Sequence, residues 1–126
     1  MAVITLNDAS PVPKYQQIVD QIKAHVVAGT LPPGTPLPSV RQLATDLSIN
    51  VNTVLAAYHA LDAEGVVLLR HGARAVIHPR LGQRAEPAPH DVAQVRGALE
   101  RVRADALLLG MTPEALASLA RDVFEP

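Results

Sequence analysis

The chain has 126 residues, with 11 Lys and Arg against 12 Asp and Glu and a formal net charge of −1. This length suits one domain, or one small domain with an appendage, and leaves no room for a separate catalytic domain. It has no cysteine and can therefore form neither a disulfide framework nor a thiolate zinc site. No stretch approaches the 18 apolar residues of a membrane span, and the N-terminus lacks the pattern of a signal peptide, so we expect a soluble, cytoplasmic protein.

The first predicted element is an amphipathic helix. Apolar residues recur at steps of three and four between Pro13 and Ala28, with Pro13 suited to the first turn and Gly29 to the end. Residues 31–38 follow with four prolines and one glycine, a composition that excludes a helix. This stretch is predicted to be a connector of fixed shape.

Two short capped helices are predicted next, on either side of a three-residue turn. Ser39 is an N-cap and Gln42 completes a capping box, which predicts a helix over Val40–Leu47. Asn50 caps the following helix, which Gly65 terminates. The inward positions of that helix are Val54, Ala57, Tyr58 and Leu61. We therefore interpret Tyr58 as a core residue rather than a platform on which bases stack.

A β-hairpin and a linker are predicted to complete the first domain. Residues 66–69 and 73–77 are β-branched and aliphatic, with His71 and Gly72 between them. Prolines and scattered charges in residues 80–90 indicate a linker. The predicted boundaries are residues 1–79 for the first domain, 80–90 for the linker and 91–126 for a helical region.

The helical region is predicted to dimerise. Apolar residues alternate steps of three and four from Val92 to Leu109, the seam of a helix that packs against another helix, and Thr112 caps a second helix that runs to about Phe124. Packing within one subunit is the alternative, but two short helices alone make a thin core. The predicted dimerisation residues are Val92, Val95, Leu99, Val102, Ala106, Leu109, Leu116 and Leu119.

The order of these elements is that of a winged helix-turn-helix, so the predicted fold is mainly α with a small β-hairpin wing, followed by a C-terminal two-helix dimerisation hairpin. In such a domain the third helix enters the major groove of DNA by its N-terminal turn, where this chain has Asn50, Asn52 and Thr53. The wing can enter the adjacent minor groove, with Arg74 supplying charge. Double-stranded DNA is the predicted partner.

Four blocks of residues, taken together, resemble the N-terminal DNA-binding domain of GntR-type bacterial regulators over residues 11–79. The blocks are Pro13-Lys14-Tyr15-Gln16-Gln17-Ile18, Gly29-Thr30-Leu31 with Pro33-Gly34 and Leu37-Pro38-Ser39-Val40-Arg41-Gln42-Leu43-Ala44, Asn50-Val51-Asn52-Thr53-Val54, and Leu61-Asp62-Ala63-Glu64-Gly65. The short helical tail is similar to that of the YtrA-type subgroup.

The resemblance implies roles for residues in both helices and in the wing. Arg41 would contact DNA from the start of the second helix, and Gly72 would sit in the minor groove, flanked by Arg70 and His71. The predicted DNA-binding residues are Ser39, Arg41, Asn50, Asn52, Thr53, Arg70, His71, Gly72 and Arg74. Relatives usually carry an arginine at the position of Leu55 or Ala56, and their wing commonly reads Gly-x-Gly-Thr, whereas this chain has neither feature.

Arg41, Asn50 and the overall charge also allow other interpretations. Arg41 could be a solvated helix residue or could pair with Asp46 or Asp62, and Asn50 is expected to act chiefly as a cap. Residues 1–80 carry a net charge of only +1 and the remainder −2, so a winged-helix module that binds protein without specific DNA binding is the alternative function.

We expect no enzyme, metal site or cofactor. The five histidines include no His-x-x-x-His pair, and the chain shows neither a phosphate loop nor a nucleophile with its base. The function predicted from the sequence is a transcriptional regulator, a repressor by default, that binds a palindromic operator as a homodimer. The tail cannot enclose a sizeable pocket, so a small effector of unknown identity is expected only at the dimer interface or between domains.

Overall fold

The computed structural model describes residues 4–70, 74–83 and 86–125. The chain divides into two compact units, Met1–Gln83 and Arg84–Pro126. In the part that the structure describes, no helix combines the length and the apolar character needed to cross a membrane.

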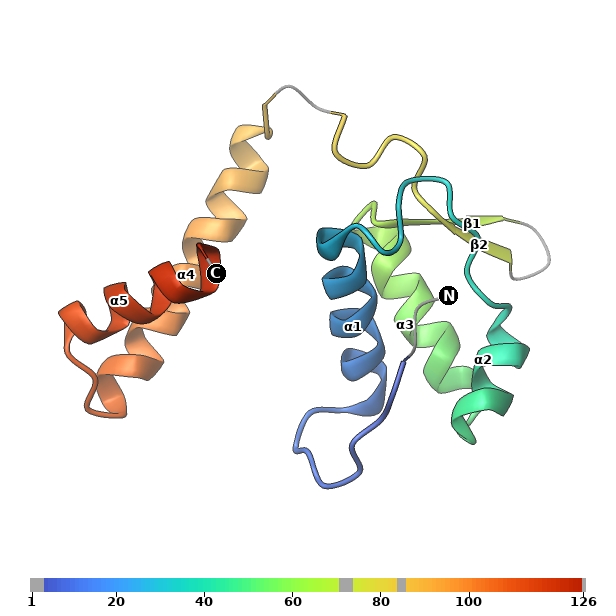
Figure 1. The fold of residues 1–126 in the computed structure, drawn as a ribbon, viewed down its shortest axis with the longest axis horizontal. Helices are drawn as coiled ribbons and strands as arrows, with labels where there is room; N and C mark the ends of the chain where they lie inside the picture. Colours follow the sequence, from blue (N-terminus) through green and yellow to red (C-terminus); the bar gives the residue numbers. More distant parts are fainter. Residues whose placement is uncertain (1–3, 71–73, 84–85, 126) are drawn as a thin grey trace. The chain divides into compact units, whose positions relative to one another are not determined.

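The first unit contains three helices and a hairpin, α1 (Lys14–Ala28), α2 (Val40–Leu47), α3 (Val51–Ala63), β1 (Val67–Arg70) and β2 (Arg74–Ile77). Helix α3 packs against α1, α2 and β1, and the two strands are antiparallel (Figure 1). The largest fully buried side chains are Tyr58, Ile18, Ile22, Leu61, Ile77, Val54 and Val67. The predicted winged helix-turn-helix and the inward position of Tyr58 are confirmed.

The hairpin begins one residue later than predicted. Val66 donates its N–H to the carbonyl oxygen of Leu61 at 3.0 Å and so closes the end of α3 instead of opening the strand. In the ladder that follows, Val67 lies opposite Ile77 and Arg70 lies opposite Arg74. The proline-rich connector then adds hydrogen bonds along β2: Leu37 N–H donates to the oxygen of Ala75, and Ile77 N–H donates to that of Thr35, both at 2.8 Å.

The segment before α1 is held by two glutamines, a feature that the sequence did not suggest. The Gln21 amide donates to the oxygen of Thr5 and accepts from its N–H. One turn earlier, Gln17 makes the same pair of bonds with Asn7. These side chains substitute for a β-strand partner, and the segment runs back along α1 (Figure 1).

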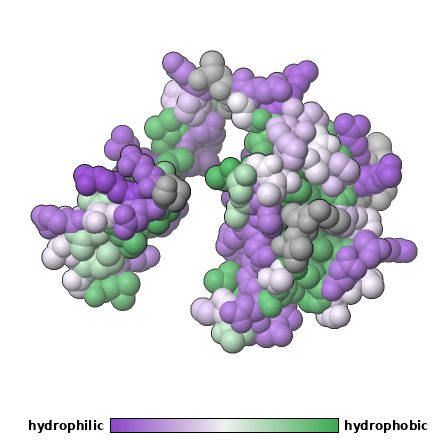
Figure 2. All heavy atoms as spheres, in the orientation of Figure 1, coloured by the Kyte–Doolittle hydropathy of each residue, from purple (hydrophilic) through white to green (hydrophobic). Residues whose placement is uncertain are grey.

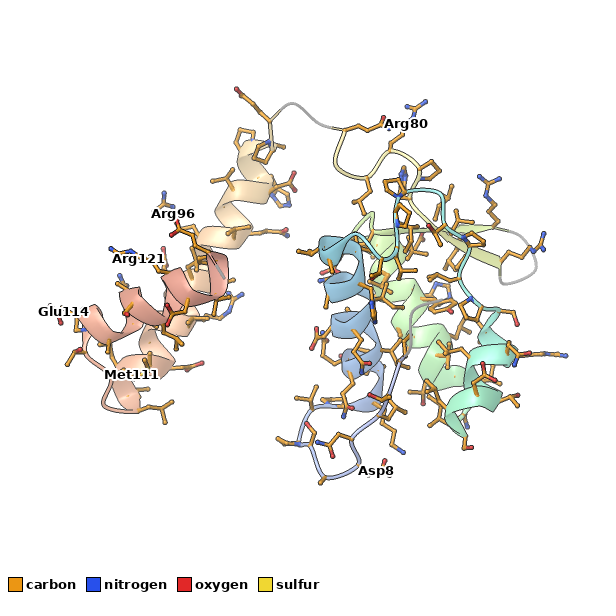
Figure 3. All side chains as sticks on the ribbon, viewed as in Figure 1. Asp8, Arg80, Arg96, Met111, Glu114 and Arg121 are labelled. Atoms are coloured by element: carbon orange, nitrogen blue, oxygen red, sulfur yellow. The ribbon has the colours of Figure 1, made fainter. Side chains whose placement is uncertain are left out.

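The second unit is a helical hairpin of α4 (Pro89–Leu108) and α5 (Pro113–Phe124). Helix α4 begins inside the stretch predicted as linker, because Pro89 occupies a first-turn position, where its missing N–H costs nothing. Thr112 caps α5, its hydroxyl accepting from Ala115 N–H at 3.1 Å, as predicted. Figure 3 shows Met111 in the turn between the helices and Glu114 at the start of α5.

Candidate nucleic-acid interface

The N-terminus of α2 is capped by Ser39, whose hydroxyl oxygen accepts from the backbone N–H of Gln42 at 3.1 Å. The predicted capping box is wrong in its second half. Gln42 does not return to Ser39 but donates from its side-chain amide to Asp46 at 2.7 Å, one turn further along. A cap satisfies one of the free N–H groups of the first turn and leaves others available to an anion.

The connector and the core together fix the position of this N-terminus. Leu37 is bonded to β2, and the carbonyl oxygen of Pro38 accepts from the Tyr58 hydroxyl at 2.7 Å. Burial raises the pKa of the Tyr58 phenol, because the charged phenolate would be desolvated. The phenol therefore stays protonated and donates, which holds Ser39 beside the base of the wing.

A hollow of about 430 Å³ lies between the connector and the wing, and Ser39, Arg70 and Arg74 are among its lining residues. The two arginines are directly opposed in the hairpin, an arrangement of like charges that destabilises a two-stranded ladder. Neither makes an ion pair with any residue that the structure describes. Unpaired guanidinium groups beside a helix N-terminus suit an anion such as a phosphate of the DNA backbone.

Arg41 is exposed, one residue inside α2. Among the residues that the structure describes, Arg41 forms an ion pair with neither Asp46 nor Asp62, so that alternative is wrong. The Arg41 guanidinium thus remains available to a ligand.

The tip of α3 is organised by Asn50. Its side-chain oxygen accepts from Asn52 N–H at 2.7 Å, so the prediction that Asn50 acts as a cap is confirmed. The side chain of Asn52 is exposed, whereas Thr53 is half-buried. Asn52 is therefore the better placed of the two to reach a base edge, where an amide can pair with adenine.

The outward face of α3 extends beyond the predicted residues. Ala56 and His59 are exposed at helical spacing from Asn52, and Val51 is exposed at the tip. Leu55, by contrast, packs against the core. Sequence reasoning missed Val51 and His59, although the spacing opposite the inward positions of α3 could have identified His59.

The structure brings together some predicted residues and separates others. Ser39, Arg70 and Arg74 share one hollow, whereas the residues at the α3 tip follow the opposite end of α2. An eight-residue helix is roughly 12 Å long, so the two groups suit contacts with different parts of a duplex. The predicted wing-tip residues His71 and Gly72 lie outside the described residues.

The C-terminal unit carries a second exposed surface. Four seam residues of α4, hereafter the α4 stripe, are Val92, Val95, Leu99 and Val102, and each is about half exposed. Hydrophobic residues are visible on the outside of this unit in Figure 2. An apolar stripe on a helix is usually covered by another element.

The remaining predicted dimerisation residues differ in their surroundings. Ala106 is 5% exposed and is the buried point of the hairpin, while Leu116 is half-buried on α5. Leu109 lies just past α4 and is 82% exposed, and Leu119 is 49% exposed. Ala106 therefore serves packing within one chain, whereas the α4 stripe and Leu109 are the parts of the seam left open.

The described residues contain no group of three or more His, Asp or Glu that could hold a metal ion. The groups described at the candidate interface are helix termini, arginines and amides.

Comparison with known proteins identifies similar domains. The family model for bacterial regulatory proteins of the gntR family matches residues 14–77. The transcriptional repressor YtrA of Bacillus subtilis is 43% identical over 65 residues, which cover 52% of this chain and 50% of that protein. The chain spans half or less of the length of the curated relatives it matches first.

Two solved structures resemble more of the chain. A transcriptional antiterminator from Listeria monocytogenes EGD-e has a TM-score of 0.84 and 32% identity, covering 98% of this chain and 91% of that one. The GntR-family transcription factor YtrA from Sulfolobus acidocaldarius has a TM-score of 0.63 and 32% identity, with 81% and 98% covered. Both similarities extend past the winged domain into the helical tail.

Proposed function

The chain belongs to the gntR family of bacterial regulatory proteins, and we propose that it is a repressor that binds a palindromic operator in double-stranded DNA as a homodimer. The observation that carries this proposal is the hollow shared by Ser39, Arg70 and Arg74, which offers unpaired positive charge at a helix N-terminus. Phosphates of the DNA backbone have the charge and geometry that such a hollow accepts.

Sequence reading is assigned to the tip and outward face of α3. Asn52 is free of the capping role that Asn50 fills, and its amide suits an adenine edge in the major groove. His59 lies further along the same face. Arg41, Arg70 and Arg74 then position the domain on the backbone without specifying sequence.

Dimerisation is assigned to the α4 stripe. Its four apolar residues are left about half exposed by the hairpin of one chain, and a second copy would bury them as a helix-to-helix seam. Two winged domains related by a dyad would meet half-sites about one helical turn apart, roughly 34 Å. Occupation of a promoter by such a dimer blocks transcription, which is why we propose a repressor.

The test is a binding titration with the full chain and a duplex that carries an inverted repeat chosen from the DNA upstream of its own coding region. We expect about 10³-fold tighter binding to that repeat than to a shuffled duplex. The affinity should fall steeply between about 50 and 200 mM salt, because bound phosphates release counterions. Equal affinity for both duplexes would exclude sequence-specific binding. Absence of binding to either duplex at every salt concentration would favour the protein-interaction module.

A further inference from the structure

A cavity of about 620 Å³ lies in the first unit and shares the connector residues Pro36 and Leu37 with the hollow at the wing. Its volume is within the range of about 300 to 1,000 Å³ that is typical of small-molecule sites. Eight of its eleven described lining residues are apolar, and they come from the N-terminal segment, α1, the connector and α2. Ile4, Leu31, Leu43 and Leu47 are among them.

The polar groups in its wall include one exposed negative charge, that of Asp46. The hydroxyls of Thr30 and Thr35 already donate to the backbone oxygens of His25 and Pro32. One carboxylate oxygen of Asp46 accepts from Gln42, and no Lys, Arg or His is among the described lining residues. The second oxygen of Asp46 is thus a negatively charged acceptor beside an apolar cavity.

We propose that this cavity binds a small organic cation, with its apolar body against the leucine and isoleucine walls and its ammonium group at Asp46. Burial of apolar surface supplies most of the affinity, and the charge of Asp46 selects a cation over a neutral or anionic molecule of the same shape. The site lies within the winged domain, not in the dimer interface or between domains.

The position of the cavity also suggests regulation, a step that rests on the proposed function. Leu37 and Pro38 line the cavity directly before Ser39, and Leu43 lies on α2 two residues after Arg41. A bound molecule therefore contacts the two elements that present Ser39 and Arg41 to DNA. By linkage, the cation and DNA must change one another's affinity by the same factor.

The experiment uses phenethylamine as the cationic probe and phenethyl alcohol as its neutral counterpart. Each is titrated into the full chain without DNA, and methyl NMR shifts of leucine residues are followed. We expect saturable shifts at Leu31, Leu43 and Leu47, with the amine binding about threefold more tightly than the alcohol, as for an exposed ion pair.

Two matched variants test whether the preference for the amine depends on the charge of Asp46 or on the loss of any exposed carboxylate. Asp46→Asn should make the two probes bind equally. Asp20→Asn should leave the difference in affinity between the two probes intact, because Asp20 lies outside the cavity. It is a matched control, since Asp20 is also exposed and accepts a hydrogen bond from a glutamine one turn earlier, at 2.8 Å. Leu47→Trp fills the cavity and should weaken both probes by about tenfold or more.

The proposal is overturned by an absence of saturable shifts, by shifts confined to α4 and α5, or by equal binding of the two probes to the unaltered chain. A chain that starts at Ile4 should bind the amine within about twofold of the full chain. A tenfold gain on that truncation would instead identify residues 1–3 as the occupant. If the probe binds but leaves operator affinity unchanged, the result supports the binding site and excludes its regulatory role.

Discussion

The hydroxyl of Tyr58 donates a hydrogen bond of 2.7 Å to the carbonyl oxygen of Pro38. The bond joins the buried centre of α3 to the residue directly before the cap of α2. A fully buried side chain thereby fixes the start of α2 relative to α3. The core of this small domain thus positions the interface as well as stabilising the fold.

Tyr58→Phe should destabilise the protein by about 1 kcal/mol, because it removes one hydrogen bond and leaves the volume of the core unchanged. Urea denaturation followed by circular dichroism measures the free energy of unfolding. Tyr15→Phe is the matched control, since Tyr15 is 39% exposed and should lose little. Equal losses in the two variants would mean that the bond to Pro38 contributes nothing.

The same burial predicts a dependence on alkaline pH. The pKa of Tyr58 is raised above its ordinary value of about 10 because the phenolate would be desolvated. Its contribution to stability is therefore fully present below pH of about 10 and is lost as the pH rises above that value. In the Tyr15→Phe variant, phenolate absorbance should appear together with unfolding. Appearance of phenolate while the circular dichroism stays native would contradict this expectation.

The parts of the fold that sequence predicted well depend on local chemistry. Helix α2 has the predicted bounds, and the caps of Ser39, Asn50 and Thr112 form as expected. Each cap links residues two or three positions apart, so the chain itself brings the partners together. Apolar spacing likewise identified the inward face of α3.

The parts that sequence missed depend on partners distant along the chain or on competition between partners. Nothing in a local pattern pairs Tyr58 with Pro38 or Gln21 with Thr5. The Gln42 side chain could either accept from the backbone N–H of Ser39 or donate to the carboxylate of Asp46. It donates to Asp46, because a bond to a charged acceptor is the stronger one. The hollow at the wing likewise required knowledge of how the connector pairs with β2.

Arg41→Ala tests the proposal that Arg41, on α2, contacts a phosphate of the DNA backbone. We expect weaker operator binding and a salt dependence whose slope falls by about one, because one phosphate contact is lost. Fluorescence anisotropy at several salt concentrations provides both values. Arg101→Ala, which removes an exposed arginine from α4, should change neither. An unchanged slope in Arg41→Ala would exclude this residue from the interface.

Ala56→Arg should strengthen DNA binding, because the outward face of α3 lacks the arginine that relatives usually carry nearby. Alanine and arginine are both good helix formers, so the helix tolerates the change. We expect operator affinity to rise about fivefold, the equivalent of roughly 1 kcal/mol. Leu55→Arg is the comparison: Leu55 packs against the core, so that variant should lose stability instead. A gain from Leu55→Arg and none from Ala56→Arg would reverse the assigned orientation of α3.

Leu99→Asp should convert the proposed dimer into a monomer. Leu99 is 51% exposed in one chain and lies in the middle of the α4 stripe, where a second copy would have to bury the new carboxylate without a partner. Sedimentation velocity reports the change of mass. Operator affinity should fall by about 100-fold, because the two half-sites would no longer be held by one molecule.

Gln94→Asp adds the same charge to the same helix outside the α4 stripe, at an exposed position. It should therefore leave both the dimer and the operator affinity unchanged. If Leu99→Asp stays dimeric, the stripe is not the interface. If it becomes monomeric and still binds the palindrome with full affinity, each winged domain binds alone, and the tail would contribute nothing to recognition. Because the winged domain presents few basic groups, we expect the monomeric variant to lose affinity: tight binding to DNA depends on the pairing of two chains through α4.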